Sequence, residues 1–276
     1  MENQSVVRRQ RLKRRARRMA RRVLPFVASL FLATPLAAPV RSNAAVAATE
    51  TRLPTPAATK TMLFSQRLHD LYRDLRAEDQ GLRFAVFEKA MTGYLNLQKQ
   101  GRLADKQLLT VVDFELPSTE KRLWVLDLAA KQVKFHTLVA HGHNSGENMA
   151  TNFSNENESN MSSLGFYVTQ GEYQGKHGRS LKLKGLDEGY NTNALSRSVV
   201  MHGADYVSEE FIRQNGRLGR SLGCPALPMD QKDAIIEAVE GQTCLFLNGP
   251  DQSYSSKYLN QDIAVTTLLD RDSQMI

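Results

Sequence analysis

The spacing of apolar residues divides the chain into a helical part and a strand-rich part. Between Met62 and residue 105, apolar residues recur at steps of three and four positions, and Gly81 and Gly101 interrupt the pattern. This spacing predicts two amphipathic helices within an N-terminal helical segment, residues 62–105. We expect these helices to pack on the following domain and cover a face that would otherwise be exposed.

From Leu108 onward the pattern changes to short runs rich in β-branched and aromatic residues. Three of these runs are separated by turn residues and predict an antiparallel meander: LLTVVDFEL, RLWVLDL and KQVKFHTLVA. Four further strands are predicted, at 165–171, 180–185, 198–203 and 243–249. Short helices are predicted at 208–214 and 229–239.

The predicted fold class is therefore mainly β with peripheral α-helices and an N-terminal helical pair. The strands place the main domain at residues 106–250. Residues 251–276 show no clear period, and we treat them as a C-terminal tail whose role the sequence does not reveal.

The N-terminus has the pattern of an export signal. Residues 1–22 contain ten Arg and Lys against one Glu, the apolar stretch 23–40 is interrupted by three prolines, and residues 45–47 fit a small-x-small cleavage site. A membrane-spanning helix needs about 18 or more uninterrupted apolar residues, so no stable transmembrane anchor is expected. We predict a signal peptide over 1–47 and a flexible leader over 48–61, and we expect the protein in the periplasm or cell envelope.

The positive charge of the chain belongs to this N-terminal segment. The whole sequence has 36 basic and 29 acidic residues, a formal charge of +7. Residues 1–47 hold 11 basic and one acidic residue, so the remainder has 25 basic and 28 acidic residues and is close to −3. This balance excludes a general nucleic-acid binder as the predicted class.

One stretch, residues 199–227, contains the residues of a nucleophilic site. His202 follows an apolar run and Cys224 lies in a Gly-containing turn 22 positions later, so the two meet if the chain between them turns back. A free thiol has a pKa of about 8.5 and needs a neighbouring base to become a nucleophile at neutral pH. Backbone N–H groups near Gly223 and Cys224 would hold the oxyanion that forms when an acyl carbon is attacked.

Two other chemistries remain open for these residues. Cys224 and Cys244 are the only cysteines, and in an oxidising compartment they would suit a structural disulfide. His141, His202 and Cys224 would also provide three ligands for zinc, although their spacing matches no recognised zinc signature. We expect neither a metal nor an organic cofactor.

At these residues the chain resembles the murein L,D-transpeptidase catalytic family. Members of that family carry a histidine followed by a small residue, then a spacer, then Ser-His-Gly-Cys with Arg or Asn two positions after the cysteine. The matching residues here are His202, Gly203, Ser221, Gly223 and Cys224.

The match has two departures. Leu222 stands where the family has its second histidine, and Ala226 stands where it has Arg or Asn. The form GRLGRSLGCPAL resembles a divergent branch of the family. The stretches shared with this branch are VAHGHNSG, FSN, SSLGFY and GKHGRSLKLKG, and the resemblance covers residues 108–250.

The resemblance implies a β-sandwich or mixed sheet and a carbapenem-sensitive enzyme that acts on peptidoglycan tetrapeptide stems. Cys224 would be the nucleophile and His202 the base, held by the backbone carbonyl of Gly203, with Asp205 as an alternative orienting group. The acceptor would be a second stem, a wall-attached protein or a D-amino acid. Water as acceptor would make a carboxypeptidase or endopeptidase, and loss of activity would leave a wall-binding scaffold.

Further residues are candidates for binding the substrate. Arg217 and Arg220 lie just before the turn, and a guanidinium binds carboxylate in a two-pronged geometry. Arg220 is our candidate replacement for the cation missing at Ala226. The other candidates are Ser221 in the turn, His141 and Asn144, which line the cleft or form a solvated hairpin loop, and Tyr190 and Asn191 in a polar stretch.

Overall fold

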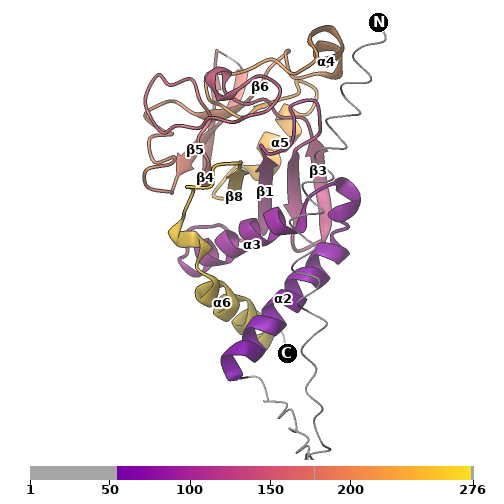
Figure 1. Cartoon of the computed structure of the whole chain (residues 1–276), viewed down its shortest axis with the longest axis vertical. Coiled ribbons are helices and arrows are strands. Elements are labelled where there is room, and N and C mark those ends of the chain that lie inside the picture. The colour runs from indigo at the N-terminus through magenta and orange to yellow at the C-terminus, as the bar shows by residue number, and fades with distance from the viewer. Residues whose placement is uncertain (1–54, 177, 275–276) are drawn as a thin grey trace, which may run out of the picture. The chain divides into compact units, whose positions relative to one another are not determined.

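The computed structural model describes residues 55–176 and 178–274 (Figure 1). The predicted signal peptide and the first half of the predicted leader lie outside these residues. The described elements are, in chain order, α2 (Pro56–Asp74), η1 (Glu78–Gln80), α3 (Phe84–Lys99), β1 (Leu108–Asp113), β2 (Leu123–Asp127), β3 (Gln132–Thr137), η2 (His143–Ser145), β4 (Gly165–Gly175), β5 (Gly178–Gly185), β6 (Val200–Gly203), α4 (Glu209–Asn215), β7 (Ala226–Leu227), α5 (Lys232–Val239), β8 (Cys244–Asn248), η3 (Lys257–Leu259) and α6 (Gln261–Gln274).

The described strands form one mixed sheet in the order β3-β2-β1-β8-β4-β5-β6-β7. Strands β1, β2 and β3 pair antiparallel as the predicted meander, with Val111 opposite Trp124. Two pairs are parallel, β1 with β8 and β6 with β7, and the other neighbours are antiparallel. The predicted fold class, a mainly β or mixed-sheet domain with peripheral helices, is confirmed.

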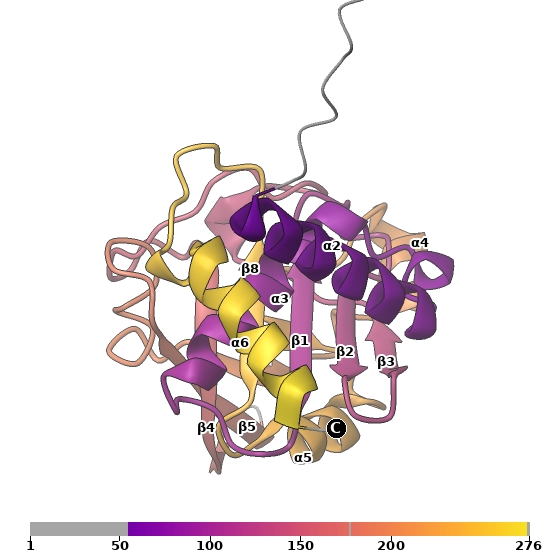
Figure 2. The ribbon, with the colours of Figure 1, turned by 90° about the horizontal axis from the view of Figure 1, so that it is seen from below.

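Helices α2, α3 and α6 lie over one face of the sheet, as Figure 2 shows. They share a single apolar core with the side chains of β1, β2, β4 and β8. Helix α3 lies tightly against β4 at Gly93, where an added Cβ would lie 2.0 Å from the Phe166 ring. Phe166 in turn stacks on Phe246, with ring centroids 4.4 Å apart. The helical segment is therefore part of the core of the domain and covers one face of the sheet.

Two helix boundaries differ from the sequence prediction. Helix α2 begins at Pro56, inside the range expected to be a flexible leader. The Thr55 hydroxyl accepts a hydrogen bond from the Ala58 amide at 3.2 Å, and proline suits the first turn of a helix because it lacks an N–H. Helix α6 forms in the predicted tail and packs against α3, where Asn96 donates to the Asn260 carbonyl at 2.9 Å.

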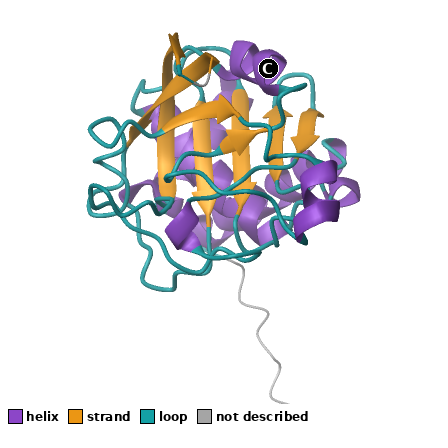
Figure 3. Cartoon of the chain, turned by 90° about the horizontal axis from the view of Figure 1, so that it is seen from above, coloured by secondary structure: helices purple, strands orange, loops and turns teal. Residues whose placement is uncertain are grey.

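The opposite face of the sheet carries α5 and long loops, seen in Figure 3. One buried carboxylate ties the segment after β8 to this structure. Asp187 accepts hydrogen bonds from the Phe166 amide and from the hydroxyls of Tyr254 and Ser256. These bonds anchor the chain before it enters α6.

Among the described residues, no helix is long and apolar enough to cross a membrane.

Candidate active site

Strands β6 and β7 bring the predicted histidine and cysteine together. Cys224 lies just before β7, which pairs in parallel with β6 so that Ala226 is opposite His202. The Val200 amide donates to the Cys224 Sγ at 3.4 Å, and the same sulfur lies 3.8 Å from the Ser198 carbonyl oxygen. A parallel pair needs a crossover, and the segment containing α4 provides it. The long separation in sequence is thus closed by strand pairing.

The His202 ring is buried and its orientation is set by a backbone carbonyl. Its side chain is at the end of β6, where the residue is 2% exposed, and Nδ1 lies 2.9 Å from the Gly203 carbonyl oxygen. A carbonyl only accepts hydrogen bonds, so Nδ1 carries the proton and Nε2 carries the lone pair that a base needs. The orienting contact is therefore the one expected for Gly203.

The turn before β7 is closed by the Ser221 hydroxyl. This hydroxyl donates to the Cys224 carbonyl at 2.6 Å and accepts from the Gly223 amide at 3.1 Å. Gly223 has φ +122°, a conformation that favours glycine. The Ser221 hydroxyl is thus used within the turn and the residue is 5% exposed, so this geometry does not support its predicted substrate contact.

The same turn changes the prediction for the oxyanion donors. The Gly223 N–H already donates to Ser221, so this amide is not the free donor that the sequence suggested. Among the described residues, the Cys224 amide has no hydrogen-bond acceptor. Of the two predicted donors, only the Cys224 amide is therefore without an acceptor among the described residues.

The two residues that depart from the family motif, Leu222 and Ala226, lie in very different surroundings. Leu222 is 68% exposed at the tip of the turn. Ala226 is fully buried in a small apolar cluster and paired on both sides, with His202 and with Ala140. A long cation at position 226 would therefore need the cluster to open.

A second segment, residues 139–143, supports the turn before β7, residues 220–224, which we call the cysteine turn. The Ala140 amide donates to the Ala226 carbonyl at 2.9 Å, the Ser221 amide to the His141 carbonyl at 3.0 Å, and the His143 amide to the Ser221 carbonyl at 2.7 Å. The backbone of the shared stretch VAHGHNSG is thus bonded to this turn, while the side chains of His143 and Asn144 are exposed. It is a backbone brace for the turn that carries the thiol.

His141 is held as a neutral, fully buried ring within this brace. The Arg122 guanidinium donates to Nδ1 at 2.7 Å, so Nε2 carries the proton and donates to the Gly146 carbonyl at 3.3 Å. Burial, and then the charge of Arg122, lower the pKa of His141 to about 4. Both ring nitrogens are occupied within the fold, so this geometry supports neither the predicted substrate contact of His141 nor the zinc alternative.

Arg217 and Arg220 are also not the free cations that the sequence predicted. Both guanidiniums pair with Glu147, at 2.8 Å each. Arg220 also donates to the carbonyls of His143 and Gly146 and its side chain is only 12% exposed. These three side chains hold the brace to the cysteine turn. The pairing with Glu147 does not support the predicted role of Arg217 and Arg220 in carboxylate binding.

The other predicted substrate contacts are structural as well. Asn191 is fully buried and bonds to the carbonyls of Leu164 and Phe166. The Tyr190 hydroxyl donates to the Ser253 carbonyl, which belongs to the segment after β8. Asn144, which is exposed, donates to the Ser159 carbonyl at 2.9 Å. None of these contacts involves the cysteine turn.

Arg197 is a site residue that sequence reasoning missed. It donates to the carbonyls of Ser154 and Met161 at 2.7 Å each, and to the hydroxyls of Ser163 and Ser159. A Cβ added to Gly223 would lie 3.2 Å from its Nη2. It lies in a loop, in the short polar run LSRS, and no period or motif marks it as different from other loop arginines.

Opposing effects act on the Cys224 thiol. Burial raises its pKa, whereas the Val200 amide and the positive charges of Arg197 and Lys176 lower it, with a net rise. The surroundings therefore do not ionise the thiol at neutral pH without a base. The charge of Arg197 limits the rise, because a nearby cation favours the thiolate.

Replacing Arg197 with glutamine is expected to raise the pKa of the Cys224 thiol further. Loss of a fixed positive charge near the sulfur should slow alkylation by iodoacetamide at neutral pH by about tenfold. The measurement is the pH profile of alkylation, which a purely structural role would not shift. Arg213→Gln is the control, since Arg213 is exposed on α4 and pairs only with Glu210. Coinciding profiles for the two variants would contradict the prediction.

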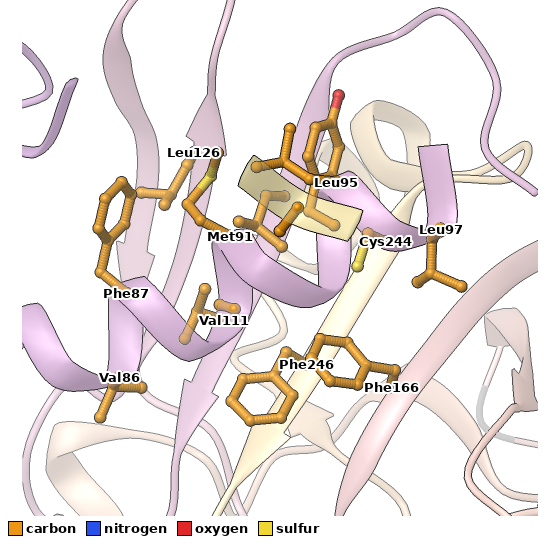
Figure 4. Close-up of a cluster of buried hydrophobic side chains, with 14 of the residues drawn as sticks. Val86, Phe87, Met91, Leu95, Leu97, Val111, Leu126, Phe166, Cys244 and Phe246 are labelled. Carbon is orange, nitrogen blue, oxygen red and sulfur yellow. The ribbon is translucent and has the colours of Figure 1, made fainter. Parts of the chain in front are cut away.

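The disulfide alternative is not what the structure shows. Cys224 and Cys244 are both free thiols. Cys244 is fully buried among the apolar residues between α3 and the sheet, as Figure 4 shows, and burial raises the pKa of its thiol. Within residues 55–176 and 178–274, no group of three or more His, Cys, Asp or Glu side chains is placed to hold a metal ion.

Comparison with known proteins identifies one family. The family model described as "L,D-transpeptidase catalytic domain" matches residues 78–248, more than half of the chain. The match begins 28 residues before the domain boundary predicted at 106, so it includes α3. A search of curated protein sequences found no match.

Several solved structures are also similar. An L,D-transpeptidase from Mycobacterium smegmatis has 12% identity over 51% of this chain and 58% of that chain, with a TM-score of 0.32. A variant of the helical cell shape determining protein Pgp2 from Campylobacter jejuni has 12% identity over 68% and 64%, with a TM-score of 0.38. An L,D-transpeptidase from Xylanimonas cellulosilytica has 11% identity over 58% and 79%, with a TM-score of 0.31. The chain spans less than two thirds of the first two proteins.

Proposed function

Because the chain belongs to the L,D-transpeptidase catalytic domain family, we propose that it is an exported peptidoglycan L,D-transpeptidase that works through an acyl-enzyme on Cys224. The observation that carries the proposal is the junction of β6 and β7. There the Cys224 sulfur lies against the Val200 amide, and the His202 ring is oriented by the Gly203 carbonyl. Nucleophilic acyl transfer requires an accessible thiol and a base that can take its proton, and a partly exposed cysteine whose pKa is raised depends on such a base.

The reaction has two steps on this geometry. In the first, Cys224 attacks the carbonyl of the L-configured centre at the third position of a tetrapeptide stem, and His202 takes the thiol proton. The new C–S bond forms as the C–N bond to the terminal D-amino acid breaks, and His202 returns the proton to the leaving amine. The Cys224 amide stabilises the oxyanion of the tetrahedral intermediate.

In the second step an amine attacks the thioester and restores the free thiol. A second stem as acceptor gives an L,D cross-link, and a D-amino acid or a wall-attached protein gives an exchange or attachment product. Water as acceptor gives a shortened stem, so the same residues would serve a carboxypeptidase or endopeptidase. Export follows from the basic head and apolar run of residues 1–47, and it would bring the enzyme to its substrate in the periplasm or cell envelope.

A wall-binding scaffold without activity is the competing proposal. It accounts for the departures at Leu222 and Ala226, but it gives no reason for a partly exposed thiol, an oriented imidazole and an unoccupied Cys224 amide in one place. We therefore prefer the enzyme.

The test is exchange of a labelled D-amino acid into a tetrapeptide stem. The purified protein is incubated with the stem and the labelled D-amino acid, and the products are separated by mass. Label in the stem supports transfer, whereas shortened stems alone support hydrolysis with the same site. Absence of both products, from protein whose Cys224 thiol is verified as free, would overturn the enzymatic proposal in favour of the scaffold.

A further inference from the structure

A pocket of about 430 Å³ opens directly beside the proposed nucleophile. It is lined by Tyr173, Lys182, Leu195, Ser198, Val199 and Val200. Two of these residues touch the thiol, because the Val200 amide donates to the Cys224 Sγ and the Ser198 carbonyl lies 3.8 Å from it. A group bound in this pocket therefore lies next to the atom that is proposed to form the acyl-enzyme.

One wall of the pocket carries a positive charge without a counter-charge. Lys182 is exposed on β5, opposite Val200 of β6, and its ammonium lies 5.5 Å from the centre of the Tyr173 ring. Among the described residues, no carboxylate forms an ion pair with it. The β4–β5 hairpin adds Lys176, whose charge reaches Cys224. This side of the thiol is thus suited to an anion.

The other wall is apolar. Leu195 is 48% exposed, and Val199 and Val200 form the floor next to the sulfur. Apolar side chains on one side and an ammonium on the other suit a small residue that has an aliphatic body and a carboxylate. The cations that the sequence offered for this purpose, Arg217 and Arg220, are paired with Glu147.

We propose that this pocket holds the terminal D-amino acid of the donor stem, with its carboxylate on Lys182. The inference rests on the proposed function and names a subsite of it. The scissile bond must lie at the Cys224 sulfur, so the leaving residue lies within one residue of it. The pocket is within this reach, because its lining residues Ser198 and Val200 contact the sulfur. An incoming D-amino acid occupies the same place during exchange, because that step is the reverse of the first.

The test measures binding without chemistry, in protein that carries Cys224→Ala. Two probes are titrated, a tetrapeptide stem with a free C-terminal carboxylate and the same peptide with a C-terminal amide. The free acid is expected to bind roughly tenfold more tightly than the amide. Adding Lys182→Glu, or Lys182→Met, should remove this preference. Lys184→Glu is the matched control, since Lys184 is exposed on the same strand two positions away and lies outside this pocket.

Equal preference for the free acid in the Lys182 and Lys184 variants would overturn the proposal. A third probe, amidated on a side-chain carboxylate of the stem, distinguishes the second source of the same chemistry. If only this amidation weakens binding in a Lys182-dependent way, the pocket holds a stem side chain and the assignment of the leaving residue is wrong. Since binding is measured without turnover, failure of the exchange assay would reject the proposed function separately from this subsite.

Discussion

Replacing Cys224 with alanine is expected to abolish both acyl-enzyme formation and stem exchange. Without the sulfur there is no atom at the β6–β7 junction to form a thioester, and the Cys224 amide alone can only bind an oxyanion. The measurement is the intact mass of the protein after incubation with a carbapenem, the acylating probe to which the resemblance implies sensitivity. A mass increase equal to the carbapenem is expected in the unchanged protein and not in the variant.

The chain offers a matched thiol as the control. Cys244 is the other cysteine and is fully buried in the core between α3 and the sheet. Cys244→Ala should keep the adduct, while the small cavity that it leaves should lower the free energy of unfolding by about 1 kcal/mol. An adduct that persists in Cys224→Ala, or one that is lost from a folded Cys244→Ala, would refute the assignment of the nucleophile.

The strand pattern of the sequence predicted most of the sheet. Each of the seven predicted strands forms, because these runs are rich in residues that favour β structure and nearly all of them bury at least one face; the edge strand β3 is mostly half-buried or exposed. The strand Ala226–Leu227 was missed because two residues carry no period. Helix α6 was missed because its first turns bury few apolar residues, Ala264 and Val265 among them, so no apolar stripe marks it.

For the site, residue types and spacing suggested His202 and Cys224 as a pair but left a disulfide and a zinc site open. The resemblance to the family is what favoured nucleophilic catalysis. The contact between His202 and the Gly203 carbonyl was expected from the family and is present. What sequence could not indicate is which polar side chains are already used by the fold.

Charged loop residues show this limit most clearly. Arg220 and Arg197 look alike in the sequence, each next to serine in a loop. In the structure Arg220 is neutralised by Glu147, 73 positions away along the chain, whereas Arg197 bonds only to carbonyls and hydroxyls and its charge reaches the thiol. Long-range pairing decides which cation is available, and no local pattern records it.

His202→Ala is expected to lower the rate of acylation at neutral pH by about 10²- to 10⁴-fold, the usual contribution of a general base. Burial raises the pKa of the Cys224 thiol, so without the imidazole most of the sulfur stays protonated. The remaining rate should therefore increase with pH, up to the raised pKa of the thiol, in a range where the unchanged protein has already reached its plateau. The measurement is the rate of carbapenem acylation from neutral to alkaline pH.

The control for this variant is His143→Ala. The His143 side chain is exposed, and the contacts that it makes to the cysteine turn use its backbone amide and carbonyl, which alanine retains. Its acylation rate and pH profile should match those of the unchanged protein. If the His202→Ala protein is instead acylated at the unchanged rate, or if its acylation is slowed by the same factor at every pH, the imidazole does not take the thiol proton. The carbonyl of Gly203 would then orient a ring whose role is structural.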